Sequence, residues 1–180
     1  MKKLVFTAIL GMFAFAGFAQ TEPPVSVPTP MDSVSHNVKL TLAEVLEVQL
    51  ASNVNGNFNF NTAAKMENGI EKADIASVQV RGNIGWELYI KAKTANTNLD
   101  NFFYTGSSTT ANEMPLNVFQ YKGGLIEAYQ GITKTNVKIA SGSAGDFESN
   151  TTLMSYKATP GFSYAPGEYT ASVWYTVSKP

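Results

Sequence analysis

The side chains that most often carry chemistry are scarce in this sequence. Its 180 residues include no cysteine, a single histidine, His36, and a single arginine, Arg81. Without cysteine the chain has no disulfide, no thiolate zinc site and no cysteine nucleophile. With one histidine it cannot form a metal site that needs several histidine ligands. A protein that binds the phosphate backbone of a nucleic acid usually has an arginine-rich surface, which a single arginine cannot provide. We therefore expect no nucleic-acid partner.

Carboxylates are present, but they do not form a recognisable catalytic pair. A glycosidase needs two of them on opposite sides of a cleft, and the candidates are scattered along the chain: Glu44, Glu47, Glu87, Glu113, Glu127, Asp146, Glu148 and Glu168. His36, beside Asn37 at the start of a predicted strand, is expected at the surface and not in a hydrolase site. We predict that the protein is not an enzyme and has no catalytic residue.

The run from Asp146 to Asn150 has the alternate oxygen spacing of a calcium loop. It lacks the glycine at the sixth position, where Thr151 stands, and the closing glutamate at the twelfth, where Lys157 stands. A plain acidic turn is the expected structure. We predict no metal and no cofactor.

The N-terminus has the features of a secretory signal peptide at residues 1–19. Lys2 and Lys3 precede an apolar run from Leu4 to Phe18, and small residues lead to cleavage after Ala19. The run is shorter than a bilayer span, so no transmembrane anchor is expected. Secretion without cysteine is common in bacteria, which predicts a protein of the periplasm or bacterial cell surface.

Residues 20–35 are rich in proline and are predicted to form a linker or an N-terminal arm. The alternative is a donated strand that fills the sheet edge of a neighbouring subunit. Because proline removes ladder donors, the donated part would be Val34 to Leu42. Both interpretations remain open from the sequence.

From residue 36 to 180 the apolar side chains mostly recur at every second position, which is typical of strands. The runs are 38–42, 45–50, 58–60, 78–80, 86–92, 116–121, 137–140, 153–158 and 169–177, with glycine- or asparagine-containing turns between them. Residues 43–50 would also suit a helix, and 63–76 could hold one helical turn. The pattern predicts an all-β, antiparallel, immunoglobulin-like β-sandwich of about eight to nine strands.

Two stretches contain the tryptophans. In residues 85–93 the alternation places Trp86 and Leu88 inward and Glu87, Tyr89, Lys91 and Lys93 outward. In residues 167–177 it points Trp174 outward, so that this ring is either covered by a loop or available to a partner.

The run from Val78 to Leu88, a polar turn followed by glycine and Trp86-Glu87-Leu88, resembles the first signature of bacterial WxL domains. The Pro-Gly-x-Tyr turn and last strand resemble the end of that family, although Trp174 stands one position before the second motif. The layout also resembles spore-coat-U-like and fimbrial domains of secreted bacterial fibres. These resemblances imply association with the cell envelope, no catalysis, and Trp86 and Leu88 as the matching positions for binding.

Softer binding features lie in the polar segment from Thr94 to Glu113, which carries Phe102, Phe103 and Tyr104. These rings either stack on sugars or fold back onto the sandwich. We expect a non-catalytic envelope or surface-fibre component whose partners are a cell-envelope polymer or other surface proteins, with self-association possible. The alternative is a carbohydrate-binding module that contacts glycans through Phe102, Phe103, Tyr104 and Trp174.

Overall fold

The computed structural model of the chain describes residues 32, 34–51, 54–95, 100–108 and 113–180. The predicted signal peptide and most of the proline-rich segment lie outside the described residues. Thr41–Pro180 forms one compact unit, and Met1–Leu40 is grouped separately. In the second group the described residues from Val34 to Leu40, His36 included, are exposed and carry no helix or strand.

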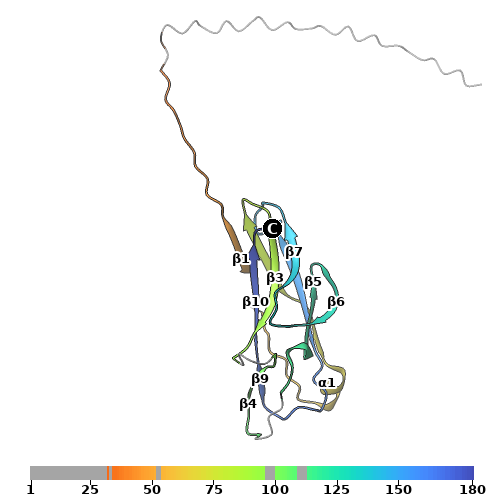
Figure 1. The fold of residues 1–180 in the computed structure, drawn as a ribbon. Coiled ribbons are helices and arrows are strands. Elements are labelled where there is room, and N and C mark those ends of the chain that lie inside the picture. Colours follow the sequence, from red (N-terminus) through yellow and green to blue (C-terminus); the bar gives the residue numbers. More distant parts are fainter. Residues whose placement is uncertain (1–31, 33, 52–53, 96–99, 109–112) are drawn as a thin grey trace, which may run out of the picture. The chain divides into compact units, whose positions relative to one another are not determined.

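The compact unit is built almost entirely of strands (Figure 1). In chain order the elements are β1 Leu46–Leu50, α1 Ala63–Asn68, β2 Ile70–Gly82, β3 Trp86–Lys93, β4 Phe103–Thr105, the 3-10 helix η1 Leu116–Val118, β5 Phe119–Gly123, β6 Ile126–Gly131, β7 Val137–Gly142, β8 Thr151–Ala158, β9 Glu168–Thr170 and β10 Ser172–Ser178. None of the described helices is long and apolar enough to span a membrane.

The strands form two main antiparallel sheets. One has the order β1-β2-β8-β5-β6 and the other β10-β3-β7, with β4 and β9 pairing separately. The neighbours β1-β2-β8 and β10-β3 follow the A-B-E and F-C arrangement of immunoglobulin-like sandwiches. The predicted all-β, immunoglobulin-like sandwich is therefore confirmed.

The alternate apolar residues of both sheets meet in one core. Val78 and Val80 of β2, Leu88 and Ile90 of β3, and Ile139 of β7 are almost completely buried there. Because successive strand residues point to opposite faces, a period of two in the sequence becomes a buried layer and an outer layer. This alternation fixes which side chains of β3 and β10 reach the surface.

The described part holds ten strands, where about eight to nine were predicted. The predicted run 169–177 is divided into β9 and β10 at Ala171, the short strand β4 lies in a segment expected to be a loop, and β6 was missed. The helical turn near residue 63 is present as α1, where the Thr62 side chain caps the first turn by accepting from the Lys65 N–H.

Two predicted strands are absent from the described residues. Just before residues 58–60 the carbonyls of Asn55 and Asn57 accept from the Lys72 ammonium at 2.8 and 2.7 Å, and Phe58 packs edge-on against Phe119. Residues 58–60 are thus held by side-chain contacts and belong to no described strand. Residues 38–42 have the alternation of a strand but pair with no described strand. Alternating residue types form a β-strand only where a second strand supplies the backbone hydrogen bonds.

Candidate functional site

One flank of the sandwich is open between β1 and β10. β1 is one of the two edge strands of the five-stranded sheet, and β10 is an edge strand of the three-stranded sheet (Figure 1). In an immunoglobulin-like sandwich a further strand, G, lies beside F, the position that β10 occupies here. None of the described strands pairs with that second edge of β10. Every second residue of β10 therefore directs its backbone N–H and C=O groups to an edge that has no described neighbouring strand.

A groove runs along this flank, which we call the β1–β10 groove. Apolar and aromatic side chains provide most of its lining, which consists of Val48, Gln49, Leu50, Val78, Val173, Trp174 and Tyr175. It holds about 240 Å³, less than the roughly 300–1,000 Å³ of common small-molecule sites. Its small volume and mostly apolar lining suit the side chains of a peptide segment better than an enclosed substrate.

A hydrogen bond between two tyrosine hydroxyls fixes one wall of the groove. Tyr175 of β10 and Tyr156 of β8 contact each other through their hydroxyl oxygens, which ties the two sheets together. Tyr156 is buried, and removal from water raises the pKa of both phenols. Both therefore stay neutral, with one hydroxyl donating to the other.

The chain enters β1 along a path held by Asn83. The Val45 N–H donates to Asn83 Oδ1 at 2.8 Å, the Asn83 N–H donates to the Val45 carbonyl at 3.1 Å, and Asn83 Nδ2 donates to the Ala43 carbonyl at 2.8 Å. An exposed ion pair joins Glu44 to Lys179. These contacts fix residues 43–45 against the turn between β2 and β3.

The segment before this entry exposes its apolar side chains. Val38 is 71% exposed, Leu40 82% and Leu42 80%. Large aliphatic side chains at alternate positions are seldom left in water over such a length. The segment thus has the alternating apolar pattern of a strand with one buried face, but its apolar side chains are exposed.

A second feature is the outer face of the three-stranded sheet, which we call the basic face. It comprises Glu87, Tyr89, Lys91 and Lys93 of β3, Trp174 of β10 and Lys138 of β7. The strand register sets Trp174 directly opposite Lys91 and Tyr89 opposite Lys138. Trp174 is 46% exposed, and the Lys93 ammonium lies 4.4 Å from its ring centroid. The predicted outward orientation of Trp174 is confirmed.

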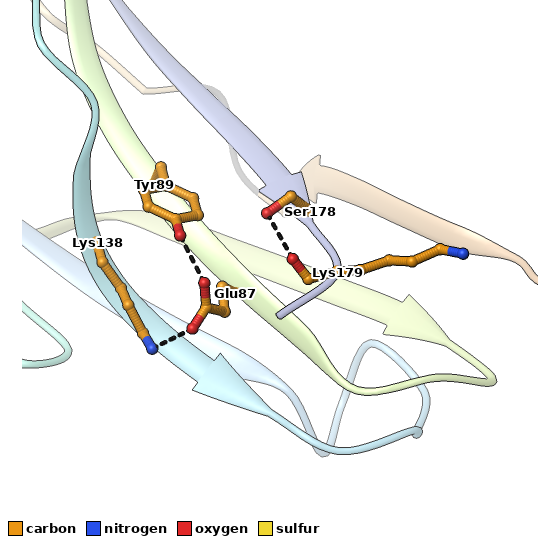
Figure 2. Close-up of polar contacts among 5 residues, drawn as sticks. All are labelled: Glu87, Tyr89, Lys138, Ser178 and Lys179. Atoms are coloured by element: carbon orange, nitrogen blue, oxygen red, sulfur yellow. Dashed lines mark hydrogen bonds and ion pairs between the residues drawn. The ribbon is translucent and has the colours of Figure 1, made fainter.

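Glu87 is the centre of a polar network on this face (Figure 2). The Lys138 ammonium donates to Glu87 Oε1, and the Tyr89 hydroxyl donates to Glu87 Oε2 at 2.5 Å. The hydrogen bond from Lys138, followed by that from Tyr89, lowers the pKa of Glu87 below its usual value. The same bond to Glu87 raises the pKa of Tyr89. The carboxylate is thus engaged by Lys138 and Tyr89 and not by Lys91 or Lys93.

Trp86 and Leu88, the positions that the WxL resemblance pointed to for binding, lie in the core. Trp86 is 3% exposed and Leu88 0%, and the Trp86 indole N–H donates to the Ser143 carbonyl at 3.0 Å. The alternation had already placed both side chains inward, which is confirmed. The folded domain therefore cannot present these side chains to a partner, and the implied binding role is corrected to a packing role.

The three aromatics at 102–104 do not form one exposed row. Phe102 is partly buried and packs against the core, whereas Phe103 is exposed. Tyr104 packs against Tyr169, with ring centroids 4.9 Å apart, and donates to the Pro166 carbonyl at 2.9 Å. These residues lie on or next to β4, and Trp174 lies on β10 in a different sheet. The four-residue glycan site stays a prediction.

The Asp146 turn is held by hydrogen bonds within the turn. Asp146 Oδ1 accepts from the Ser149 N–H at 2.9 Å and from the Ser149 hydroxyl, and these bonds lower the pKa of Asp146. Within the described ranges, no group of three histidine, cysteine, aspartate or glutamate residues is placed to hold a metal ion. The geometry is that of a capped acidic turn.

Sequence reasoning missed the combination of Trp174 with Lys91 and Lys93. The alternation already pointed all three outward, but on two separate segments. Only the pairing register of β3 with β10 shows that they are neighbours.

The chain matches no protein-family model, and no curated protein sequence matches it. Among solved structures, a chain from a chaperone–usher pilus, described in a structure on the molecular basis of rod uncoiling, is similar over 86% of this chain and 99% of that chain, with a TM-score of 0.40 and 13% identity. The resemblance to WxL domains stays a prediction.

Proposed function

We propose that this protein is a non-catalytic structural component of a bacterial surface fibre or cell envelope, and that it assembles with further copies or other envelope proteins by strand pairing. The observation that carries the proposal is the β1–β10 groove, an open apolar flank in a chain that also exposes a strand-like apolar segment. Export through the N-terminal signal peptide would bring it to the periplasm or the surface.

The β1–β10 groove and the exposed segment from Val38 to Leu42 are chemically complementary. An added strand along β10 would find free backbone groups on its edge, and its side chains on one face would point towards Val48, Leu50 and Val173. The segment from Val38 to Leu42 offers aliphatic side chains at the required spacing of two. Burying each of them contributes about 1.5–3 kcal/mol.

Contacts at the start of β1 favour filling the β1–β10 groove with the Val38–Leu42 segment of a second copy of the protein. To lie in the groove beside its own β1, the segment would have to reverse direction between residues 42 and 46. The hydrogen bonds of Asn83 with Ala43 and Val45 would then be lost. Insertion into a second copy keeps them, and it leaves the donor's own groove free for the next copy, which gives a fibre.

The test uses the secreted mature protein in analytical ultracentrifugation and in co-sedimentation with isolated cell envelopes. We expect concentration-dependent assemblies in the wild type and a shift to monomer in Leu40→Ser/Leu42→Ser. Thr41→Ser, at the intervening position, is the matched control and should assemble normally. A wild type that stays strictly monomeric and does not co-sediment with envelopes overturns the proposal, and assembly unchanged by the double variant overturns the role of the segment.

A further inference from the structure

The basic face has a charge opposite to that of the protein as a whole. The chain has a formal net charge of −1, yet the outward residues of β3, β7 and β10 in the described part include three lysines, Lys91, Lys93 and Lys138, against the single carboxylate of Glu87. A local excess of positive charge on an acidic protein draws anionic partners to that face.

Two of the three lysines are not neutralised. Lys138 is paired with Glu87. Lys93 instead lies over the Trp174 ring, and Lys91, opposite Trp174 in the register, has no ion pair or ring contact with any described residue. Ammonium groups that are not engaged by carboxylates remain able to bind an external anion.

An exposed indole lies in the same patch as these charges. The faces of indole rings pack against flat, partly apolar groups such as the C–H face of a sugar ring, and Trp174 is among the exposed large hydrophobic residues of the described chain. Tyr89 and Thr176 lie opposite each other on the neighbouring strands β3 and β10, and both carry a hydroxyl group on the basic face. From Lys93 to Glu87 the face extends about 20 Å along β3, long enough for several linked sugars.

We propose that the basic face is a binding site for an acidic polysaccharide whose anionic groups are uronate carboxylates. Lys91 and Lys93 pair with the carboxylates. Lys93 leaves the Trp174 ring to do so, and Trp174 then stacks on a sugar ring. Trp174 lies at the border of this face and also lines the β1–β10 groove, whereas Lys91 and Lys93 point away from the core on β3 and do not line the groove. The lysine variant therefore distinguishes this site from the strand-pairing function.

A single-stranded nucleic acid is the competing polyanion, since it too combines negative charge with rings that stack. The face favours the polysaccharide because it offers one indole with hydroxyl groups beside it, where a nucleic-acid groove offers successive aromatic side chains and arginine. The chain's single arginine, Arg81, is on β2, in the other sheet, and pairs with Glu47.

The experiment is titration calorimetry of the full mature chain with polygalacturonate, with neutral dextran and single-stranded DNA as comparison ligands. We expect binding to polygalacturonate that weakens with added salt, and none to dextran. Lys91→Gln/Lys93→Gln and Trp174→Ala should each weaken binding about tenfold or more, because the first removes the two ammonium groups that pair with the carboxylates and the second removes the stacking ring.

Lys122→Gln is the matched control, because it removes one lysine from β5 in the other sheet, where its ammonium lies over the Tyr129 ring. It should bind like the wild type, and thermal unfolding should show every variant to be folded. Absence of binding at low salt, equal weakening by Lys122→Gln, or equal or tighter binding of DNA overturns the proposal. Leu40→Ser/Leu42→Ser should bind polygalacturonate normally, which separates failure of this site from failure of assembly.

Discussion

The hydroxyl contact between Tyr156 and Tyr175 makes a sharp test of how the two sheets are held together beside the groove. Replacing Tyr175 by phenylalanine removes one hydroxyl and leaves the other, on the buried Tyr156, without its partner. An unpartnered buried hydroxyl costs about 1–3 kcal/mol. With a urea m-value of about 2 kcal/mol/M, the unfolding midpoint should fall by about 0.5–1.5 M.

The double variant separates this bond from the rest of the packing. In Tyr156→Phe/Tyr175→Phe neither hydroxyl remains, so its loss of stability should be clearly smaller than the sum of the two single losses, with a coupling energy of about 1 kcal/mol. Urea unfolding followed by circular dichroism gives all four free energies. Tyr121→Phe is the control, because the buried Tyr121 hydroxyl has no hydrogen-bond partner among the described residues, and it should be neutral or stabilising. Additive single losses, or a Tyr121→Phe loss as large as theirs, would refute the reasoning.

Two further predictions concern the basic face and the core beneath it. The pKa of Glu87 is lowered in the folded state, chiefly by the hydrogen bond from Lys138. The ionised Glu87 therefore contributes fully to the stability of the fold above its unfolded pKa of about 4.3, and this contribution is lost as the pH falls through the lower folded pKa. The melting temperature of the wild type should therefore drop more steeply than that of Glu87→Gln as the pH is lowered below this range, and parallel profiles would contradict it. A Cβ at Gly142 would lie 2.5 Å from the Trp86 ring, whereas one at Gly56 would meet nothing within 4 Å. Gly142→Ala should therefore lose about 1–3 kcal/mol in urea unfolding and Gly56→Ala very little, and equal losses would exclude the ring contact as the cause.

Much of the sandwich could be predicted from periodicity, because a strand in a two-layer fold shows its buried face as every second residue. The run at 86–92 became β3 with Trp86 and Leu88 inside and Lys91 outside, as the alternation indicates. Periodicity was less informative where another interaction replaced the neighbouring strand. Phe58 and Phe60 alternate like strand residues, but Lys72 takes the nearby carbonyls of Asn55 and Asn57.

The sequence by itself determined the alternation of inner and outer residues, the outward Trp174 and the small number of reactive side chains, since these depend only on residue type and spacing. Only the tertiary structure decided which outward residues are neighbours. The register of β3 with β10 sets Trp174 against Lys91, and the sheet order leaves one edge of β10 without a described partner strand. Pairing between distant segments is long-range, so no local pattern encodes it, and both proposed binding surfaces depend on it.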